Sequence, residues 1–357
     1  MRSHRILSFI AFALVLSASV TARAEEFTDT VRKQFSLQPG GTLTIEADFG
    51  HINLKSGEGN AVIVEVSRRV RTATREEAQR IFDDFELTGT GGGNSLTITG
   101  EFKEGWQRRE RGSSGRHQYN NCHSRDGEQV CLTYARELRQ HSYTITIPRK
   151  LDLSVRTQGG HISGPAIEGK LYARSAGGHI EFGDVSGTAD VSTAGGHIEL
   201  GNIGAKADIR TAGGHISVRN VNGELEAETA GGSISAGDVE GKVRANTAGG
   251  SINIASAKGS IQAHTSGGSI SAKFAAQPNE DSSFETSGGS VSVAFAPGIR
   301  ANVEAESSSG RVISEFDEVR SNDSRWRGEA RGAINGGGPR VRISTSSGSV
   351  RLSRAAL

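Results

Sequence analysis

One repeat unit of this 357-residue chain has the sequence Gly177-Gly178-His179-Ile180-Glu181-Phe182-Gly183-Asp184-Val185-Ser186-Gly187-Thr188-Ala189-Asp190-Val191-Ser192-Thr193-Ala194. Its first four residues also occur, at a spacing of 18, as Gly159-Gly160-His161-Ile162, Gly195-Gly196-His197-Ile198 and Gly213-Gly214-His215-Ile216. Serine replaces the histidine in the next three copies, which begin at Gly231, Gly249 and Gly267. A fixed period this short is typical of a solenoid, in which each unit buries its apolar face by stacking on its neighbours.

Apolar and polar residues alternate within the unit. Counted from the first glycine as position 1, positions 4, 6, 9, 13 and 15 are mainly aliphatic. This period of two predicts two short strands per coil with a turn near Gly187. We expect position 17, a threonine or serine, to point inward, and the Asp or Asn at position 8 to form a turn ladder. The apolar positions do not recur every six residues, as they would in a left-handed hexapeptide helix. The sequence therefore predicts an all-β, right-handed parallel β-helix or β-solenoid with coils of about 18 residues.

Three regions can be distinguished along the chain. Residues 1–24 combine a basic start, an apolar run and the small-x-small ending Ala22-Arg23-Ala24, which predicts a cleaved signal peptide. An uncleaved N-terminal anchor is the alternative. Residues 25–150 are predicted to form an N-terminal β-rich capping region with an insertion loop at 101–142. Residues 151–357 are predicted to form the solenoid repeats.

One short helix is expected within the capping region. Thr74 followed by Glu77 is a capping box, which favours a helix start. The apolar residues after it fall on one helical face, and they are Ala78, Ile81, Phe82 and Phe85. A helix at this place would close the end of the stack against edge pairing.

The charge of the chain argues against a nucleic-acid partner, and its hydropathy argues against a membrane span. Without residues 1–24 the chain has 38 basic and 40 acidic residues, a net charge of −2. Nucleic-acid-binding proteins normally show a basic domain or stripe, so we expect no nucleic-acid partner. No later segment is apolar enough to cross a bilayer, so we expect no transmembrane domain in the mature chain.

Cys122 and Cys131 are the only cysteines in the chain. In an exported protein a close, even pair predicts a disulfide that closes a local loop. Two free thiols are the alternative. A zinc site would need a second ligand pair of the CxxC type, and the neighbouring sequence does not supply one.

Four histidines share position 3 of the repeat, and we expect them to form an outward-facing ladder. They are His161, His179, His197 and His215. Imidazole suits transition metals such as zinc, copper or nickel, so the ladder is a candidate metal site. Stacked imidazoles are also candidate pH sensors, because protonation sets like charges side by side. The third interpretation is structural, namely duplication of a residue that stacks well, and the switch to serine halfway along the repeats favours it.

The 101–142 insertion carries the residues most typical of a recognition loop. Exposed aromatic and arginine side chains are common binding anchors. The partner-binding candidates are Trp106, Arg108, Arg109, Arg111 and Tyr119. The alternative is a charged loop that only shields the edge of the first coil.

Several motifs outside and inside the repeats resemble those of a known family. They are Phe35-Ser36-Leu37 with Pro39-Gly40-Gly41, Gly50-His51-Ile52, Ile147-Pro148, the Thr-Ala-Gly-Gly-x-Ile units, and the ending from Gly337-Gly338-Pro339 to Ser347-Gly348-Ser349-Val350. In their order and spacing they resemble the bacterial "putative adhesin" family, an envelope β-strand-repeat domain of unknown function. The resemblance spans nearly the whole chain after residue 24 and implies a β-solenoid at the cell envelope.

We therefore expect a non-enzymatic exported protein in the periplasm, on the cell surface or secreted. It would act as an adhesin or as an envelope binding or scaffold module for a protein or a glycan. The alternative is a metal-binding or pH-sensing envelope protein that uses the histidine ladder. A carbohydrate-active β-helix enzyme would need carboxylates that converge in a groove, and no repeat column supplies them. Apart from a transition metal on the histidines, no cofactor is expected.

Overall fold

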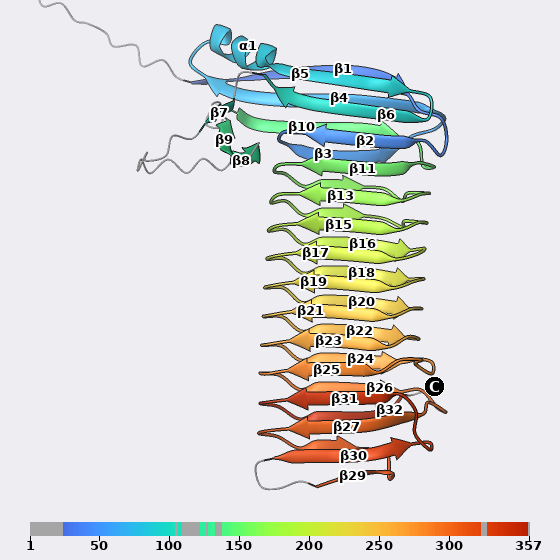
Figure 1. The fold of residues 1–357 in the computed structure, drawn as a ribbon. Helices are drawn as coiled ribbons and strands as arrows, with labels where there is room; N and C mark the ends of the chain where they lie inside the picture. The colour runs from blue at the N-terminus through green and yellow to red at the C-terminus, as the bar shows by residue number, and fades with distance from the viewer. Residues whose placement is uncertain are drawn as a thin grey trace, which may run out of the picture.

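The computed structural model describes residues 24–103, 106–108, 122–125, 128–132, 138–322 and 327–355, with backbone alone for the segments from 106 to 132. Within these residues two long sheets stack coil upon coil along one axis, and the helix lies at the N-terminal end (Figure 1). The predicted all-β, parallel-stacked solenoid is therefore confirmed.

Each coil contributes one strand to each long sheet. In spatial order the first sheet contains β1(Glu25–Ser36), β4(Ala61–Thr72), β10(Leu138–Ile147), β3(His51–Ser56), β12(Ile162–Gly164), β14(Ile180–Phe182), β16(Ile198–Ile203), β18(Ile216–Val221), β20(Ile234–Val239), β22(Ile252–Ala257), β24(Ile270–Phe274), β26(Val291–Phe295), β32(Val350–Arg354) and β28(Val312–Ser314). The second contains β29(Val319–Ser321), β30(Gly328–Ile334), β27(Ala301–Ser307), β31(Arg340–Thr345), β25(Ser282–Thr286), β23(Ile261–Thr265), β21(Val243–Thr247), β19(Leu225–Thr229), β17(Ala207–Thr211), β15(Ala189–Thr193), β13(Leu171–Ser175), β11(Asp152–Thr157), β2(Thr42–Ala47), β6(Ser95–Phe102) and β5(Phe85–Gly92). A small third sheet contains β7(Trp106–Arg108), β9(Glu128–Leu132) and β8(Cys122–Arg125).

The 18-residue period sets the register of the stack. Ile180 of β14 pairs with Ile198 of β16, and Val191 of β15 pairs with Ile209 of β17. In-register parallel pairing places equivalent side chains of successive coils beside one another. The predicted apolar positions are accordingly buried, at no more than 3% exposure in the quoted unit. The core is a thin column of aliphatic side chains between the two sheets.

Two hydrogen-bonded ladders hold successive coils together at their corners. Thr193 Oγ1 donates to the Gly178 carbonyl at 2.8 Å, and the same bond recurs in the following coils. Thr193 is buried, which confirms the inward orientation predicted for position 17. At the other turn, the Asn202 backbone N–H donates to Asp184 Oδ1 at 2.8 Å, as expected for a turn ladder.

Antiparallel strands and the helix close the N-terminal end. β4 pairs antiparallel with β1 and β10, and β5 pairs antiparallel with β6. The helix α1(Arg75–Asp84) is capped as predicted, because Glu77 N–H donates to Thr74 Oγ1 at 3.2 Å. The Glu77 carboxylate accepts from the N–H of Ala73, one residue before the N-cap, at 3.1 Å. Phe85 is buried but follows the helix as its C-cap. β2 and β3 pair in parallel with β11, β10 and β12, so parallel stacking begins within residues 25–150.

The C-terminal end does not stack in chain order. β31 lies between β25 and β27, and β32 lies between β26 and β28. β30 pairs antiparallel with β27 and with β29, which ends the second sheet. The last coil of the chain is thus inserted between two earlier ones. The order of the repeats did not predict this arrangement.

A buried polar cluster lies in the N-terminal cap. Arg68 forms an ion pair with Asp29 and donates to the Phe82 carbonyl at 2.6 Å. His141 Nε2 lies 3.0 Å from the Tyr143 hydroxyl oxygen. Burial, together with the nearby charge of Arg68, lowers the pKa of His141 to about 3. His141 is therefore neutral in the folded protein near pH 7.

We predict that His141 makes the protein less stable in acid. In the unfolded chain the histidine binds a proton below about pH 6.5, whereas folded His141 stays neutral down to about pH 3. Its contribution to the free energy of unfolding is therefore complete above about pH 6.5. That contribution falls with pH by up to about 1.4 kcal/mol per unit. Chemical denaturation at a series of pH values measures the slope. His141→Gln should flatten it, and an unchanged slope in the variant would refute this assignment.

Candidate functional site

The four predicted histidines form a continuous stack on the outer face of the first sheet. Successive ring centroids from His161 to His215 are 4.7, 4.8 and 4.9 Å apart, with interplanar angles of 5°, 7° and 8°. His51 extends the stack by one ring, 4.9 Å from His161. His51 belongs to the Gly50-His51-Ile52 motif, but it was not among the histidines predicted for the ladder.

Each imidazole accepts a hydrogen bond from the backbone of the next coil. The His179 N–H donates to His161 Nδ1 at 2.9 Å, and the His197 N–H donates to His179 Nδ1 at 2.8 Å. Further along, the Ser251 N–H donates to Ser233 Oγ at 3.1 Å. Histidine and serine thus supply the same acceptor at position 3, which explains how one replaces the other halfway along the stack.

This geometry favours a structural role over a metal site. Because Nδ1 accepts a backbone hydrogen bond, the neutral ring carries its proton on the exposed Nε2. A metal on Nε2 would displace that proton to Nδ1 and remove the acceptor. Nearly parallel rings also direct their nitrogens side by side instead of toward one point. Within the described residues, no three His, Cys, Asp or Glu side chains are grouped to hold a metal ion.

Protonation would disrupt the same ladder. A proton on Nδ1 converts the acceptor into a donor that faces another N–H. It also places positive rings less than 5 Å apart. Burial and the neighbouring His51 lower the pKa of His161, so its ring resists protonation more than an ordinary histidine does.

The partner-binding candidates of the insertion are only partly described. Trp106 and Arg108 lie on β7, which pairs antiparallel with β9, and nothing is described of their side chains. Arg109, Arg111 and Tyr119 lie outside the described residues. Their role in partner binding stays a prediction.

The two cysteines occupy opposite positions in a strand pair. In the antiparallel pairing of β8 with β9, Cys122 is directly opposite Cys131. Opposite residues in such a pair have Cα atoms about 4.5–5.5 Å apart, within the range that a disulfide spans. The side chains are outside the described part of the structure, so the disulfide stays a prediction.

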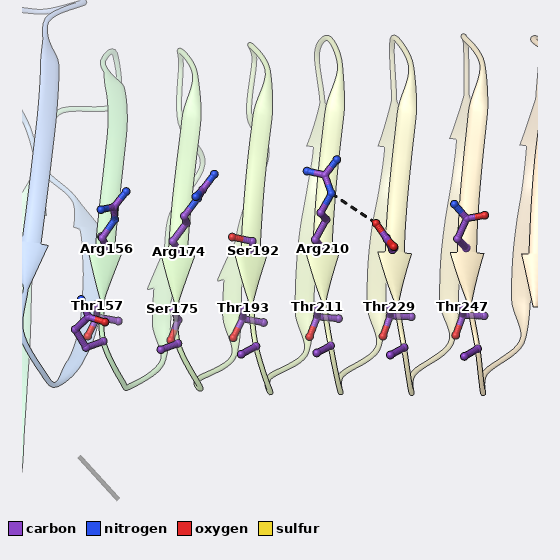
Figure 2. Close-up of a pocket in the computed structure, with 18 of the residues that line it drawn as sticks. Arg156, Thr157, Arg174, Ser175, Ser192, Thr193, Arg210, Thr211, Thr229 and Thr247 are labelled. Atoms are coloured by element: carbon purple, nitrogen blue, oxygen red, sulfur yellow. Dashed lines mark ion pairs between the residues drawn. The ribbon is translucent and has the colours of Figure 1, made fainter. Parts of the chain in front are cut away.

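A long groove, here called the axial groove, runs across seven coils where the strands of the second sheet end. Its volume is about 850 Å³. One wall is position 16, with Arg156, Arg174, Ser192, Arg210, Glu228, Asn246 and His264. The opposite wall is position 18, with Gln158, Ala176, Ala194, Ala212, Ala230, Ala248 and Ser266. Figure 2 shows the position-16 side chains projecting on one side, with the position-17 ladder beside them.

The groove follows from the repeat. The position-17 side chain points inward, so the surface is hollow between the outward side chain at position 16 and the small residue at position 18. At about 4.8 Å per coil, six steps give a length of about 29 Å. The signal in the sequence was the alanine column at position 18 beside a polar column at position 16. Neither column was among the predicted functional positions.

Charge is unevenly distributed along the groove. Arg210 lies among three carboxylates, 2.6 Å from Asp208, 3.6 Å from Glu226 and 3.7 Å from Glu228. Burial raises the pKa of Asp208, and the neighbouring Arg210 opposes that shift. Arg156 forms no ion pair within the described residues. The end of the groove nearest the N-terminal cap is therefore the more basic one.

We predict that the ladder depends on an acceptor at position 3. His179→Ala removes the acceptor of the His197 N–H and should lower the free energy of unfolding by about 1 kcal/mol. His179→Ser should lose clearly less, because serine supplies that acceptor in later coils. Chemical denaturation near neutral pH measures both variants. Equal losses would refute the acceptor role. A zinc-induced rise in the melting temperature of the unmodified protein, abolished by His179→Ala, would support a metal site instead.

Solved structures with weak overall similarity to the chain come from several bacteria. A "putative adhesin" from Parabacteroides distasonis is 11% identical, with 92% of this chain and 97% of that chain covered and a TM-score of 0.33. A "putative lipid binding protein" from the same species is 13% identical over the same shares, with a TM-score of 0.30. A "putative adhesin" from Bacteroides fragilis is 11% identical over the same shares, with a TM-score of 0.30.

The sequence comparisons give the family. No curated protein matches the chain. Among the described residues, no helix has both the length and the apolar character needed to span a membrane. The sequence profile of the family named Toastrack DUF4097 matches residues 41–353, which run from β2 into β32. The chain belongs to the Toastrack DUF4097 family.

Proposed function

We propose that the protein is a non-enzymatic binding module of the cell envelope that holds an elongated ligand in the axial groove. The observation that carries the proposal is the groove itself, about 850 Å³ in volume and lined by residues of seven successive coils. A hollow of this shape matches an extended chain better than a compact molecule. It is open and shallow, and its length is about 29 Å.

The chemistry of the lining suits a polymer that passes across the strands. The groove runs along the stack axis, perpendicular to β13, β15 and β17, so a ligand in it cannot add a strand to the sheet. Recognition must then come from side chains. Alanine methyl groups offer apolar contact on one wall, while Arg, Ser and Asn side chains offer hydrogen bonds on the other.

The lining supports binding without turnover. Hydrolysis of a glycan usually requires two carboxyl groups that flank the scissile bond. Of the described residues that line the groove, Glu228 alone is acidic, and Arg210 lies 3.7 Å from its carboxylate. The lining therefore supplies one carboxyl group and not the pair that hydrolysis requires.

The place of action is inferred from the sequence. Residues 1–24 have the basic start, apolar run and small-x-small ending of an export signal. The near-neutral net charge of the remaining chain gives no support to a nucleic-acid partner. A module exported to the cell envelope meets glycans and envelope proteins there. We propose that the groove ligand is one of these.

In-cell photocrosslinking tests this function. We expect a diazirine amino acid in place of Ala212, on the groove wall, to give a discrete adduct. The same probe at Ser217, exposed on β18 of the other sheet, should give none. Ala194→Trp, which fills the groove one coil away, should reduce the Ala212 adduct at least tenfold. An adduct at Ser217 alone, adducts that Ala194→Trp does not reduce, or no adduct at Ala212 would contradict the proposal.

A further inference from the structure

Two arginines face each other across adjacent coils at the basic end of the axial groove. Arg156 of β11 is in register with Arg174 of β13. Like charges directly opposite each other on neighbouring strands destabilise a sheet unless something neutralises them. This pair is therefore a local excess of positive charge built into the groove wall.

The carboxylates of the chain do little to neutralise the pair. Asp190 lies 3.9 Å from Arg174, and both side chains are nearly half exposed. An exposed ion pair at this distance contributes little. Arg156 forms no ion pair in the part of the chain that the structure describes, although Glu46 is its register neighbour on the other side. Arg210 lies further along the groove, and its charge is neutralised by three neighbouring carboxylates.

Tyr172 of β13 lies outside the groove lining, next to the two arginines at this end. Arg156 Nη2 donates to the Tyr172 hydroxyl at 3.4 Å, and the Arg174 guanidinium lies 4.5 Å from the centre of the Tyr172 ring. Both guanidinium groups are thus held beside one aromatic ring. Planar guanidinium groups bind carboxylates through paired hydrogen bonds, and an aromatic ring offers a flat apolar surface. Arginines beside an aromatic surface suit a ligand that is acidic at one point and has an apolar face next to it.

We propose that Arg156, Tyr172 and Arg174 bind an acidic sugar of a glycan that lies in the axial groove. The sugar carboxylate would lie between the two guanidinium groups, with the sugar ring beside Tyr172. The next sugar units of the glycan would contact the alanine wall. Their hydroxyl groups would donate hydrogen bonds to side chains further along the groove, such as Ser192 and Asn246. This inference rests on the proposed function and adds the ligand class.

The charge pattern distinguishes this ligand from other polyanions. A polyphosphate or nucleic-acid chain would need positive charge along its whole length. Here Glu228 lies in the far half of the groove, and Arg210 is already paired. An acidic peptide would satisfy the arginines but would leave its backbone donors and acceptors without a strand edge to pair with. A glycan with widely spaced acidic residues fits the groove best.

Calorimetric titration of the full mature chain tests the ligand class. The probes are a hexasaccharide that alternates glucuronic acid with N-acetylglucosamine, a neutral N-acetylglucosamine hexasaccharide, and a hexaglutamate peptide. We expect the acidic hexasaccharide to bind at least tenfold more tightly than either of the others. Arg156→Gln, Arg174→Gln and Tyr172→Leu should each weaken it at least fivefold. Arg219→Gln, an exposed arginine on β18 outside the groove, is the matched control and should change nothing. Circular dichroism verifies that each variant is folded.

Several outcomes would overturn the proposal. Equal affinity for the acidic and neutral hexasaccharides, or no binding of either, removes the acidic-sugar site. Equal binding of hexaglutamate with no effect of Tyr172→Leu indicates an acidic peptide instead. If Ala194→Trp abolishes the in-cell adduct at Ala212 but the arginine variants bind normally, the groove function stands and the acidic-sugar site fails. If the acidic hexasaccharide binds through the arginines but Ala212 gives no adduct, the groove-wide function fails.

Discussion

The close approach of successive coils at the glycine corner is the constraint on which the rest of this structure depends. A Cβ atom at Gly178 would overlap the carbonyl of Gly160 and lie 2.6 Å from the His161 nitrogen, and the same overlap recurs at the second glycine of each following unit. Only because this corner lacks side chains can adjacent coils come close enough for the Thr193 hydroxyl and the His161 imidazole to hydrogen-bond across them. Burial, the ladders and the groove all follow from that spacing.

Once the spacing is fixed, every column of the sequence becomes a line in space. The position-3 column becomes a row of acceptors for backbone N–H groups, and the position-17 column becomes a row of inward hydroxyls. Positions 16 and 18, on either side of that inward row, become the two walls of the axial groove. A binding surface of this kind can change its chemistry coil by coil without disturbing the core. The sequence does so, from Arg156 at the basic end to Glu228 in the far half.

Much of the fold could be predicted because the period is local and regular. The alternation around Ile180 and Val191 predicts both strands of a coil, and the Thr74–Glu77 capping box predicts the helix. The role of the histidines was harder to predict. Imidazole and serine are chemically different, and their shared role is evident only from the structure, where Nδ1 and Oγ accept the equivalent backbone N–H. The insertion of β31 and β32 between earlier coils was not predictable, since the looser C-terminal repeats pair by fit and not by order. The groove was not predicted, because its depth depends on the relation between positions 16 and 18, and neither position carries a motif of its own.

Alanine substitution at the two adjacent glycines of one corner measures how much the fold depends on close stacking there. A Cβ atom at Gly177 meets nothing within 4 Å, whereas at Gly178 it meets the backbone of the preceding coil. Thermal and denaturant unfolding of Gly177→Ala should therefore stay within about 0.5 kcal/mol of the unmodified protein. Gly178→Ala should lose about 1–3 kcal/mol or more, because the coils must move apart. Equal stability of the two variants would contradict the claim that close stacking at this corner holds the solenoid and its groove together.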